Sequence, residues 1–424
     1  MLNSIIKFLH NLNPEIIVQA PSRINLINPL DAVEGDFWMP SVAINGRENP
    51  LSAFFYIKKS TGVNRIKFYK IKKSRENYNF EIEYEEELLK DLTEIKKKFT
   101  GKFKLIYACI YRFRKTNSIF WDRFLEQNFE IGLLTTIPRQ SGLGGSAAII
   151  ISILYGFAKY FNLYKSLSYF KEADFPINKD IIAEMATKIE DEDLKITAGY
   201  SDRYVISRGG LCFCSYYGKL FHKEISMEPL AIYDRIDNTY DISELPIIIC
   251  FSGFFHESGG VHSTLRKKYL REDPKILNHY EKLAKIAWKS RFALMKRNWR
   301  LLGKLFKENT NIMNQVMSEA GFEYGIGLVN NILIKLIENH PDVYAAKLTG
   351  AGGGGSVFAL VNPEKIDNVL QDWKKNLNEI IINDSLFKSK FPSYPLKVRT
   401  QLKNAEFFRI KINHSGVSTL KNLE

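Results

Sequence analysis

The chain has 424 residues, of which 45% are apolar and 25% are charged. This length suits two or three folded units, and the composition excludes a mainly disordered protein. Lys and Arg number 60 against 47 for Asp and Glu, so the net charge is +13. Such an excess indicates an anionic partner, which could be nucleic acid, a membrane surface or a phosphorylated small molecule.

The cysteines and the apolar runs indicate a cellular compartment. Four cysteines are too few for a disulfide scaffold, and Cys212 and Cys214 flank Phe213 as core residues on one strand face, with no second half of a zinc site. No stretch reaches about 18 uninterrupted apolar residues, and the first residues lack the pattern of a signal peptide. We therefore expect a reduced, cytoplasmic protein that binds no membrane.

The first half of the chain predicts both strands and helices. Strand-like runs lie at residues 15–30, 38–44, 51–59, 65–72 and 129–137, and the third and fourth alternate as half-buried antiparallel strands do. Helical spacing is found at residues 83–99, 103–115 and 147–163. The first of these helices carries acidic residues before basic ones, as the helix dipole favours, and the last is apolar nearly all round.

The second half continues this mixture. Helices are predicted at residues 178–195, across most of 262–340 and at 364–377, and strands at 246–253, 343–350, 356–361 and 407–416. Residues 203–216 predict a hairpin or a strand pair. Strands and helices intermixed in this way predict the α+β class, with a change of fold near residue 220.

A glycine-rich loop lies between a strand and the buried helix, and reads PRQSGLGGSAA from Pro138 to Ala148. Glycines let backbone N–H groups approach a phosphate, the start of a helix adds free donors, and the Ser146 hydroxyl can ligate Mg²⁺. The loop matches GxGxxA at Gly142, Gly144 and Ala147, but no strand ending in an acid follows, and a Walker A lysine is absent. The prediction is phosphate binding outside both of those nucleotide folds; the alternative is a plain strand-to-helix turn.

A second glycine loop reads KLTGAGGGGS from Lys347 to Ser356. A hairpin needs only one or two glycines, so four in succession indicate that substrate or the first loop approaches the backbone. Two other segments carry polar groups: the cluster Glu190–Asp193, followed by Asp202 in a glycine-containing turn before a strand, and the segment Pro21–Asp31. One carboxylate could reach a metal and another a substrate hydroxyl, although acidic clusters are commonly solvated helix ends.

Taken in chain order, from the Pro21–Asp31 segment through the first glycine loop and Asp202 to the second glycine loop, the four elements resemble the GHMP kinase superfamily, which includes galactokinase, homoserine kinase, mevalonate kinase and phosphomevalonate kinase. The resemblance spans residues 18–361. It is strongest to the glucuronokinase type, because that group's motifs are similar to IPRQSGLGGSAAI, AGYSDRYVISRGGL, SGGVHSTLRKKYL and NPLDAVEG. Gly145 departs from the serine that is usual in that group.

The resemblance implies an α+β fold of two domains, residues 1–220 and 221–424, the first ribosomal protein S5 domain 2-like and the second ferredoxin-like. It implies an ATP- and Mg²⁺-dependent kinase of carbohydrate metabolism that phosphorylates a sugar hydroxyl, most similar to a glucuronokinase-like sugar 1-kinase. A monomer or homodimer without nucleic acid is expected. The alternatives are a heptose-phosphate, galactokinase-like or mevalonate-pathway kinase, and a non-catalytic anion- or nucleic-acid-binding protein.

The resemblance also implies roles for individual residues. Asp202 is the base or orients the attacking hydroxyl, and Arg23 lies near that hydroxyl. Ser146 and Glu190 ligate Mg²⁺, with Asp191 as the alternative to Glu190. The expected nucleotide contacts are Pro138, Ser141, Gly142, Leu143, Gly144, Gly145, Ser146 and Ala147, and the expected substrate contacts are Asn28, Asp31, His262, Gly352 and Gly353. Arg266 is a further candidate for a substrate carboxylate or phosphate, and Ser263 and Thr264 are expected to cap the helix after His262.

Overall fold

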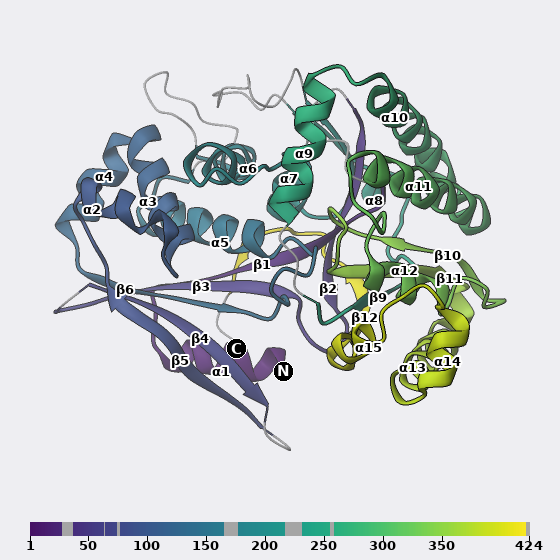
Figure 1. The fold of residues 1–424 in the computed structure, drawn as a ribbon. Helices are drawn as coiled ribbons and strands as arrows, with labels where there is room; N and C mark the ends of the chain where they lie inside the picture. Colours follow the sequence, from purple (N-terminus) through teal and green to yellow (C-terminus); the bar gives the residue numbers. More distant parts are fainter. Residues whose placement is uncertain are drawn as a thin grey trace.

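The computed structural model describes residues 1–27, 37–62, 64–73, 77–164, 177–216, 231–254 and 258–420. Within these ranges the strands join in a mixed sheet with helices packed on it, which confirms the predicted α+β class (Figure 1). The strands are β1 (Ile16–Asn25), β2 (Met39–Gly46), β3 (Ser52–Lys59), β4 (Arg65–Lys73), β5 (Tyr78–Glu87), β6 (Phe129–Thr135), β7 (Leu211–Tyr216), β8 (Ala231–Arg235), β9 (Ile247–Phe251), β10 (Val343–Leu348), β11 (Ser356–Val361), β12 (Glu406–Ile412) and β13 (Ser418–Thr419).

The helices cover both faces of this sheet. In the first half of the chain they are α1 (Leu2–Asn11), α2 (Leu92–Lys97), α3 (Lys104–Thr116), α4 (Ser118–Glu126), α5 (Gly145–Tyr160), α6 (Lys179–Lys188) and α7 (Ser201–Arg208). In the second half they are α8 (Ile236–Thr239), α9 (Ser258–Leu270), α10 (Pro274–Met295), α11 (Trp299–Glu319), α12 (Leu328–Lys335), α13 (Ile366–Ile382), α14 (Asp384–Lys390) and α15 (Lys397–Gln401). Among the described residues, none of these helices is both long and apolar enough to cross a membrane.

Strand β1 lies near the middle of the sheet and changes partner along its length. Its first part, residues 16–21, pairs with β3, and its last part, residues 22–25, pairs with β2. The strand order is β10-β11-β9-β12-β2-β1-β3-β6-β4-β5, so β12 joins the strands of the two halves of the chain. The end of the chain then returns to β1 through β13. The division at residue 220 stays a prediction, and it would leave β13 paired with the first domain.

Helix α5 and helix α1 cover opposite faces of β3 (Figure 1). Phe55 packs edge-on against Phe157 of α5, while Phe54 and Tyr56 pack with Ile5 of α1. Burial on both faces explains why β3 is not the half-buried strand that its sequence predicts. Both strands have antiparallel partners, as predicted: β3 pairs with β1 and β6, and β4 pairs with β5 while it also runs parallel to β6. Strand β4 is the half-buried strand that its alternation predicts.

The helix predicted at residues 83–99 is wrong for its first half, which forms strand β5. This edge strand pairs with the basic strand β4, and charged side chains meet across it, as in Arg65 with Glu85 (3.2 Å) and Lys72 with Glu81 (2.6 Å). Such cross-strand charge pairs favour the strand over the helix. The helix itself is only α2, which begins where the Asp91 carboxylate accepts the N–H groups of Thr93 and Glu94.

The strand pair predicted at residues 203–216 is also wrong in part. Residues 201–208 form helix α7, and only β7 is a strand. Helix α7 packs against α6, where the Tyr204 hydroxyl donates to Glu184 (2.8 Å), so tertiary packing overrides the β-branched sequence. Gly209 and Gly210, both at positive φ, end the helix. Asp202 therefore lies in the first turn of a helix, and not in a turn before a strand.

Helix α9 begins at Ser258, earlier than its sequence predicts. Ser263 and Thr264 consequently lie inside the helix, where both hydroxyls donate to the Gly260 carbonyl oxygen. Their predicted role as caps of the helix is wrong. His262 likewise lies inside α9 and is half-buried.

Candidate active site

The first glycine loop connects β6 to α5 as predicted. Gly142 and Gly144 adopt φ values of 71° and 78°, a region that glycine enters without strain. Helix α5 begins at Gly145, so its first N–H groups lack partners within the helix and lie at the loop. The loop therefore combines a close backbone approach with the positive end of a buried helix, which suits an anion.

The second glycine loop packs directly on the first. A Cβ atom added to Gly350 would lie 3.0 Å from the Gly142 Cα, and one added to Gly355 would lie 2.8 Å from the Ser141 oxygen. Of the two partners that the sequence allowed for this loop, the first loop is the one in contact. Gly352 and Gly353 instead face the segment before α12, where the Gly353 N–H donates to the Ile326 oxygen (2.7 Å).

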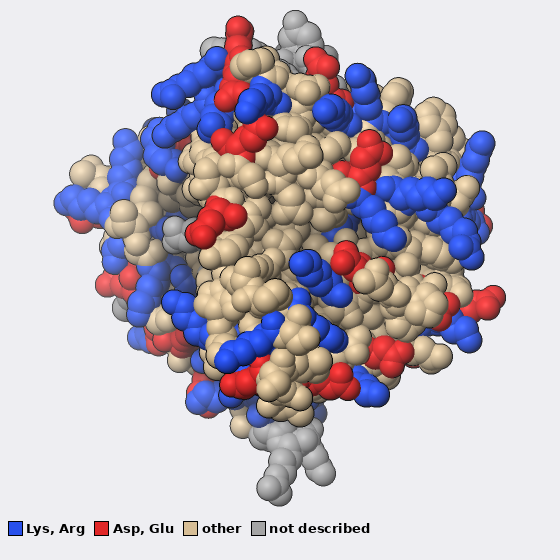
Figure 2. Space-filling view, turned by 45° about the vertical axis from the view of Figure 1, so that its right-hand side comes forward, with Lys and Arg blue, Asp and Glu red and all other residues tan. Residues whose placement is uncertain are grey.

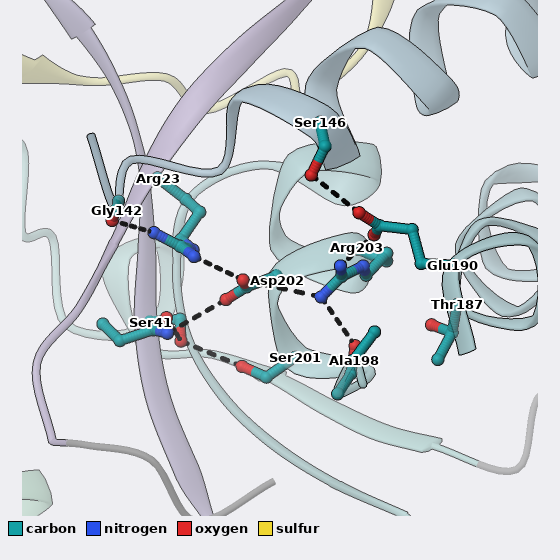
Figure 3. A network of polar contacts seen from close by, with 12 residues as sticks. Arg23, Ser41, Gly142, Ser146, Thr187, Glu190, Ala198, Ser201, Asp202 and Arg203 are labelled. Carbon is teal, nitrogen blue, oxygen red and sulfur yellow. Dashed lines mark hydrogen bonds and ion pairs between the residues drawn. The ribbon is translucent and has the colours of Figure 1, made fainter. Parts of the chain in front are cut away.

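Arg23 and Asp202 form a buried ion pair at the end of β1 (Figure 3). The same guanidinium donates to the Gly142 carbonyl oxygen (2.5 Å), which ties the pair to the glycine loop. Asn25 Nδ2 donates to the other carboxylate oxygen of Asp202 (3.0 Å), and its own amide oxygen accepts from the Ser41 hydroxyl (2.8 Å). Asp202 is thus held from the strand side, where β1 changes partner.

The surroundings of Asp202 keep it ionised. Burial by itself would raise the pKa of this carboxyl, but the neighbouring Arg23 guanidinium outweighs burial, with help from Arg203 and the Asn25 amide. The pKa of Asp202 is consequently held well below its usual range. The carboxylate accepts hydrogen bonds and is a weak proton acceptor.

Ser146 and Glu190 meet at the start of α5 (Figure 3). The Ser146 hydroxyl donates to Glu190 Oε1 (2.7 Å), and Arg203 pairs with the second oxygen of this buried carboxylate. Glu190 lies in the π-helical turn Ile189–Asp193 that extends α6. Among the described residues there is no cluster of three His, Cys, Asp or Glu side chains that could hold a metal. A hydroxyl and one carboxylate fit Mg²⁺, which takes oxygen ligands and leaves most positions to water and phosphate.

Asp191, the alternative metal ligand, faces away from Ser146. Its Oδ1 accepts from Arg266 Nη1 (2.7 Å) and from the Ala198 N–H (3.2 Å). The remaining acids of the cluster, Glu192 and Asp193, pair with the buried Arg112 of α3. The acidic cluster is therefore not a solvated helix end, and the structure brings Glu190 alone of its members to Ser146.

His262 projects from α9 toward the ionic group. Its electrostatic neighbours are Asp202, Arg203, Arg266 and Arg23, and its Nδ1 is buried with no hydrogen-bond partner among the described residues. The pKa of His262 is lowered to about 4, mainly by burial; Asp202 opposes this shift, and the three arginines add to it. The ring is neutral near pH 7 and has a ring nitrogen available to a ligand.

Asn28 and Asp31, two of the expected substrate contacts, lie outside the described residues. The structure also adds residues to which sequence reasoning gave no role. Asn25 and Arg203 bind the two functional carboxylates, and Asn330 Nδ2 supports the second loop by donating to the Gly354 oxygen (3.1 Å). The sequence does contain a signal for Arg203: it directly follows Asp202 in an apolar segment, and a buried arginine requires a carboxylate partner.

Two sequence models of known domains match the chain in the order that the motifs predict. The model described as the GHMP kinases N-terminal domain matches residues 104–210, which include the first loop and Asp202. The model described as GHMP kinases C-terminal matches residues 281–379, which include the second loop.

Individual relatives agree with these matches. Probable glucuronokinase 2 of Arabidopsis thaliana is 27% identical over 284 residues, which cover 66% of this chain and 70% of that protein. The D-glycero-alpha-D-manno-heptose 7-phosphate kinase of Campylobacter jejuni is 26% identical over 254 residues, 58% of this chain and 66% of that protein. The structure of Lactococcus lactis galactokinase complexed with galactose aligns with a TM-score of 0.63 at 15% identity, over 99% of this chain and 100% of that one, and it supports the fold. The ordered motifs and the two domain matches show that this chain carries the N-terminal and C-terminal domains of the GHMP kinases.

Proposed function

We propose that this kinase transfers the γ-phosphoryl group of ATP to a hydroxyl of a sugar or sugar acid, and that its activity is that of a glucuronokinase-like sugar 1-kinase. The observation that carries the proposal is the Arg23–Asp202 pair bonded to the glycine loop through Gly142. A sugar acceptor is supported by the relatives named as a glucuronokinase and a heptose-phosphate kinase.

The nucleotide phosphates would lie on the first loop. Backbone N–H groups from Gly142 to Ala147 are the donors, and Pro138 and Leu143 shape the turn. The Ser141 hydroxyl is buried with no hydrogen-bond partner among the described residues, so it is available to a phosphate oxygen. Gly350 and Gly355 hold the loop from behind, which reduces the reorganisation needed on binding.

Ser146 and Glu190 are the residues that would hold Mg²⁺. When bound, this ion neutralises charge on the transferring group and on the leaving diphosphate. Arg203 already pairs with one carboxylate oxygen of Glu190, while the other oxygen accepts from Ser146, so this carboxylate is held in place beside Ser146. The positive end of α5 and the Arg23 guanidinium offset further negative charge at the same place.

Asp202 would orient the acceptor hydroxyl. Each carboxylate oxygen has two acceptor positions, so Oδ1 can accept from the hydroxyl while it still accepts from Asn25. Because its pKa is depressed, Asp202 takes the proton only as the new O–P bond forms and the hydroxyl becomes strongly acidic. An anomeric hydroxyl is more acidic than an ordinary alcohol and suits such a weak base.

The sugar itself would contact His262 and the segment that contains Asn28 and Asp31. His262 Nδ1 supplies one hydrogen bond from the α9 side. Gly352 and Gly353, also proposed near the substrate, act through the shape of the second loop, because the Gly353 N–H already donates to Ile326.

The excess of positive charge does not require nucleic acid. Figure 2 shows Lys and Arg spread over one face, densest toward its margin, with Asp and Glu between them. A mixed surface of this kind favours solubility over a continuous phosphate track. The described cysteines Cys109, Cys212, Cys214 and Cys250 are all buried and free, as expected for the reducing cytoplasm in which we place the protein.

A substrate panel tests the proposal. ADP release is coupled to NADH oxidation for uronic acids, hexoses, heptose phosphates and mevalonate, each with ATP and Mg²⁺. We expect the highest kcat/KM with a uronic acid such as D-glucuronate. Preference for a heptose phosphate would replace the acceptor and keep the mechanism, preference for mevalonate would refute a sugar substrate, and no ADP release with any acceptor would refute a kinase of these substrates.

A further inference from the structure

Helix α9 presents a second charged residue to the site. Arg266 lies four residues after His262, so both project from one face of the helix. Its guanidinium donates through Nη1 to Asp191 Oδ1 (2.7 Å) and through Nη2 to the Ala198 carbonyl oxygen (2.9 Å). These two donors are used within the protein, so the structure gives no support to the expectation that Arg266 contacts a substrate carboxylate or phosphate.

The segment that Arg266 holds connects the two functional carboxylates. Glu190 lies at its start and Asp202 just after its end, and the residues between Asp193 and Ser201 form no helix or strand. Two hydrogen bonds draw the segment into a closed loop, from the Ala198 N–H to Asp191 Oδ1 (3.2 Å) and from the Ile196 N–H to the backbone carbonyl oxygen of Glu190 (2.6 Å). Arg266 binds the two ends of this loop together, because it contacts Asp191 at one end and Ala198 at the other.

Only a guanidinium suits this position. Its planar donors can bind a carboxylate and a carbonyl oxygen together, whereas a lysine ammonium is a single point charge on a flexible stem. The Arg266 and Asp191 side chains are 13% and 18% exposed, so solvent screens the pair only in part. An arginine from the second half of the chain therefore fixes an irregular segment of the first half.

We propose that Arg266 is a positioning residue, which sets the distance between Glu190 and Asp202 by closing the 191–198 loop from α9. The inference rests on the proposed phosphoryl transfer, in which both carboxylates act on one reacting group. Displacement by about 1 Å can cost about a hundredfold in rate. Loss of Arg266 would therefore loosen the metal–nucleotide site and slow turnover together, without removing any group that touches the substrate.

The test compares Arg266→Ala, Arg266→Lys, Asp191→Asn and the double variant Arg266→Ala/Asp191→Asn. Lys267→Ala is the matched control, because Lys267 is an exposed cation next along α9. The first readout needs no acceptor: a fluorescent ATP analogue is titrated in the presence of Mn²⁺ and again with EDTA. The second is kcat with ATP, Mg²⁺ and D-glucuronate, and thermal unfolding shows that each variant is folded.

We expect Arg266→Ala to weaken Mn²⁺-dependent nucleotide binding about tenfold and to lower kcat by one to two orders of magnitude. Binding in EDTA should change little, and Arg266→Lys should restore only part of either loss. The double variant should be no worse than Arg266→Ala, because that change alone already removes the contact with Asp191. Lys267→Ala should match the wild type.

Three outcomes would overturn the proposal: both readouts of Arg266→Ala within twofold of Lys267→Ala, a lowered Tm with normal binding and kcat in the folded variant, or losses that multiply in the double variant. A wild-type protein without turnover on any acceptor would refute the proposed function. In that case the Mn²⁺ titration alone still decides whether Arg266 positions the nucleotide site.

Discussion

Arg23 in β1 and Asp202 in α7 form a buried ion pair across 179 residues of sequence, and Arg23 also binds the Gly142 oxygen of the glycine loop. One guanidinium thus connects a central strand, the phosphate loop and the start of a helix. The pair keeps Asp202 ionised inside the protein, and this depends on both partners. Removing Asp202 would leave the buried Arg23 guanidinium without a carboxylate, whereas removing Arg23 would leave Asp202 to Arg203 (3.5 Å) and Asn25, so we expect loss of Asp202 to destabilise the fold more.

Asp202→Asn is the sharpest change at this pair, because it keeps the shape of the side chain while it removes the charge and one of the two acceptor oxygens. We expect turnover to fall by about three orders of magnitude, since orientation and the proton acceptor are lost together. Binding of a fluorescent ATP analogue should stay within a few fold of the wild type. Asp241→Asn, at a fully exposed carboxylate, is the control. Near-normal turnover of Asp202→Asn would refute the role given to this residue.

Ser146→Ala tests the predicted metal ligand. The variant keeps the loop backbone but loses the hydroxyl that bonds Glu190, so the Mg²⁺ concentration for half-maximal rate should rise about tenfold. Ser146→Thr retains a hydroxyl and should require much less additional Mg²⁺. The two variants are compared by initial rates at fixed ATP. An unchanged Mg²⁺ requirement in Ser146→Ala would remove Ser146 from the site.

Substitution of two glycines in the first loop should affect stability and nucleotide binding to very different extents. Gly142→Ala forces a side chain into a positive φ and brings its Cβ to 3.0 Å from the Thr349 oxygen, so we expect a lower Tm and at least tenfold weaker nucleotide binding. A Cβ at Gly145 meets Ile137 only at an ordinary 3.5 Å, so Gly145→Ser should stay within about twofold. Equal effects of the two changes would contradict the contact between the loops.

The lowered pKa of His262 predicts a pH dependence of stability. Its pKa is about 4 in the folded protein and about 6.5 in the unfolded chain. Between these values the unfolded chain binds a proton that the folded chain does not, so stability rises with pH in this window. Thermal unfolding should therefore show a smaller loss of Tm from about pH 7 to about pH 5 in His262→Gln than in the wild type. Identical losses would show that His262 does not titrate as buried.

The depressed pKa of Asp202 acts in a different window. Its contribution to stability is present above the unfolded value of about 3.9 and is lost as the pH falls toward its folded pKa. The two effects are therefore separable in the same series of unfolding curves, because His262 acts above about pH 4 and Asp202 below it.

The phosphate loop could be predicted because its signal is local. Gly142 and Gly144 occupy positive φ, and an apolar run after them makes a buried helix, so a short segment specifies both loop and helix. The packing of the second loop on the first was open to prediction for the same reason, since consecutive glycines indicate a close approach. Whether the first loop or a substrate approaches the second loop depends on tertiary packing, and the spacing of the glycines in the sequence does not determine it.

Other features depend on partners far along the chain. Tyr204 and Val205 favour a strand by propensity, and only their packing between α6 and β1 makes α7 a helix. The local signal that residues before position 209 form a helix is the pair Gly209–Gly210, because glycine is favoured just after the last turn of a helix. Likewise, the bond from Asn25 to Asp202 joins residues 177 positions apart, and no local pattern announces it.

The measurement that tests the central claim most directly is ³¹P NMR of the product formed from ATP, Mg²⁺ and D-glucuronate by the wild type and by Asp202→Asn. We predict that the wild type forms ADP and one sugar phosphate in equal amounts, with the phosphorus coupled to the anomeric proton. Asp202→Asn should form neither at a comparable rate. ADP without a phosphorylated sugar, or equal product from both proteins, would contradict the account.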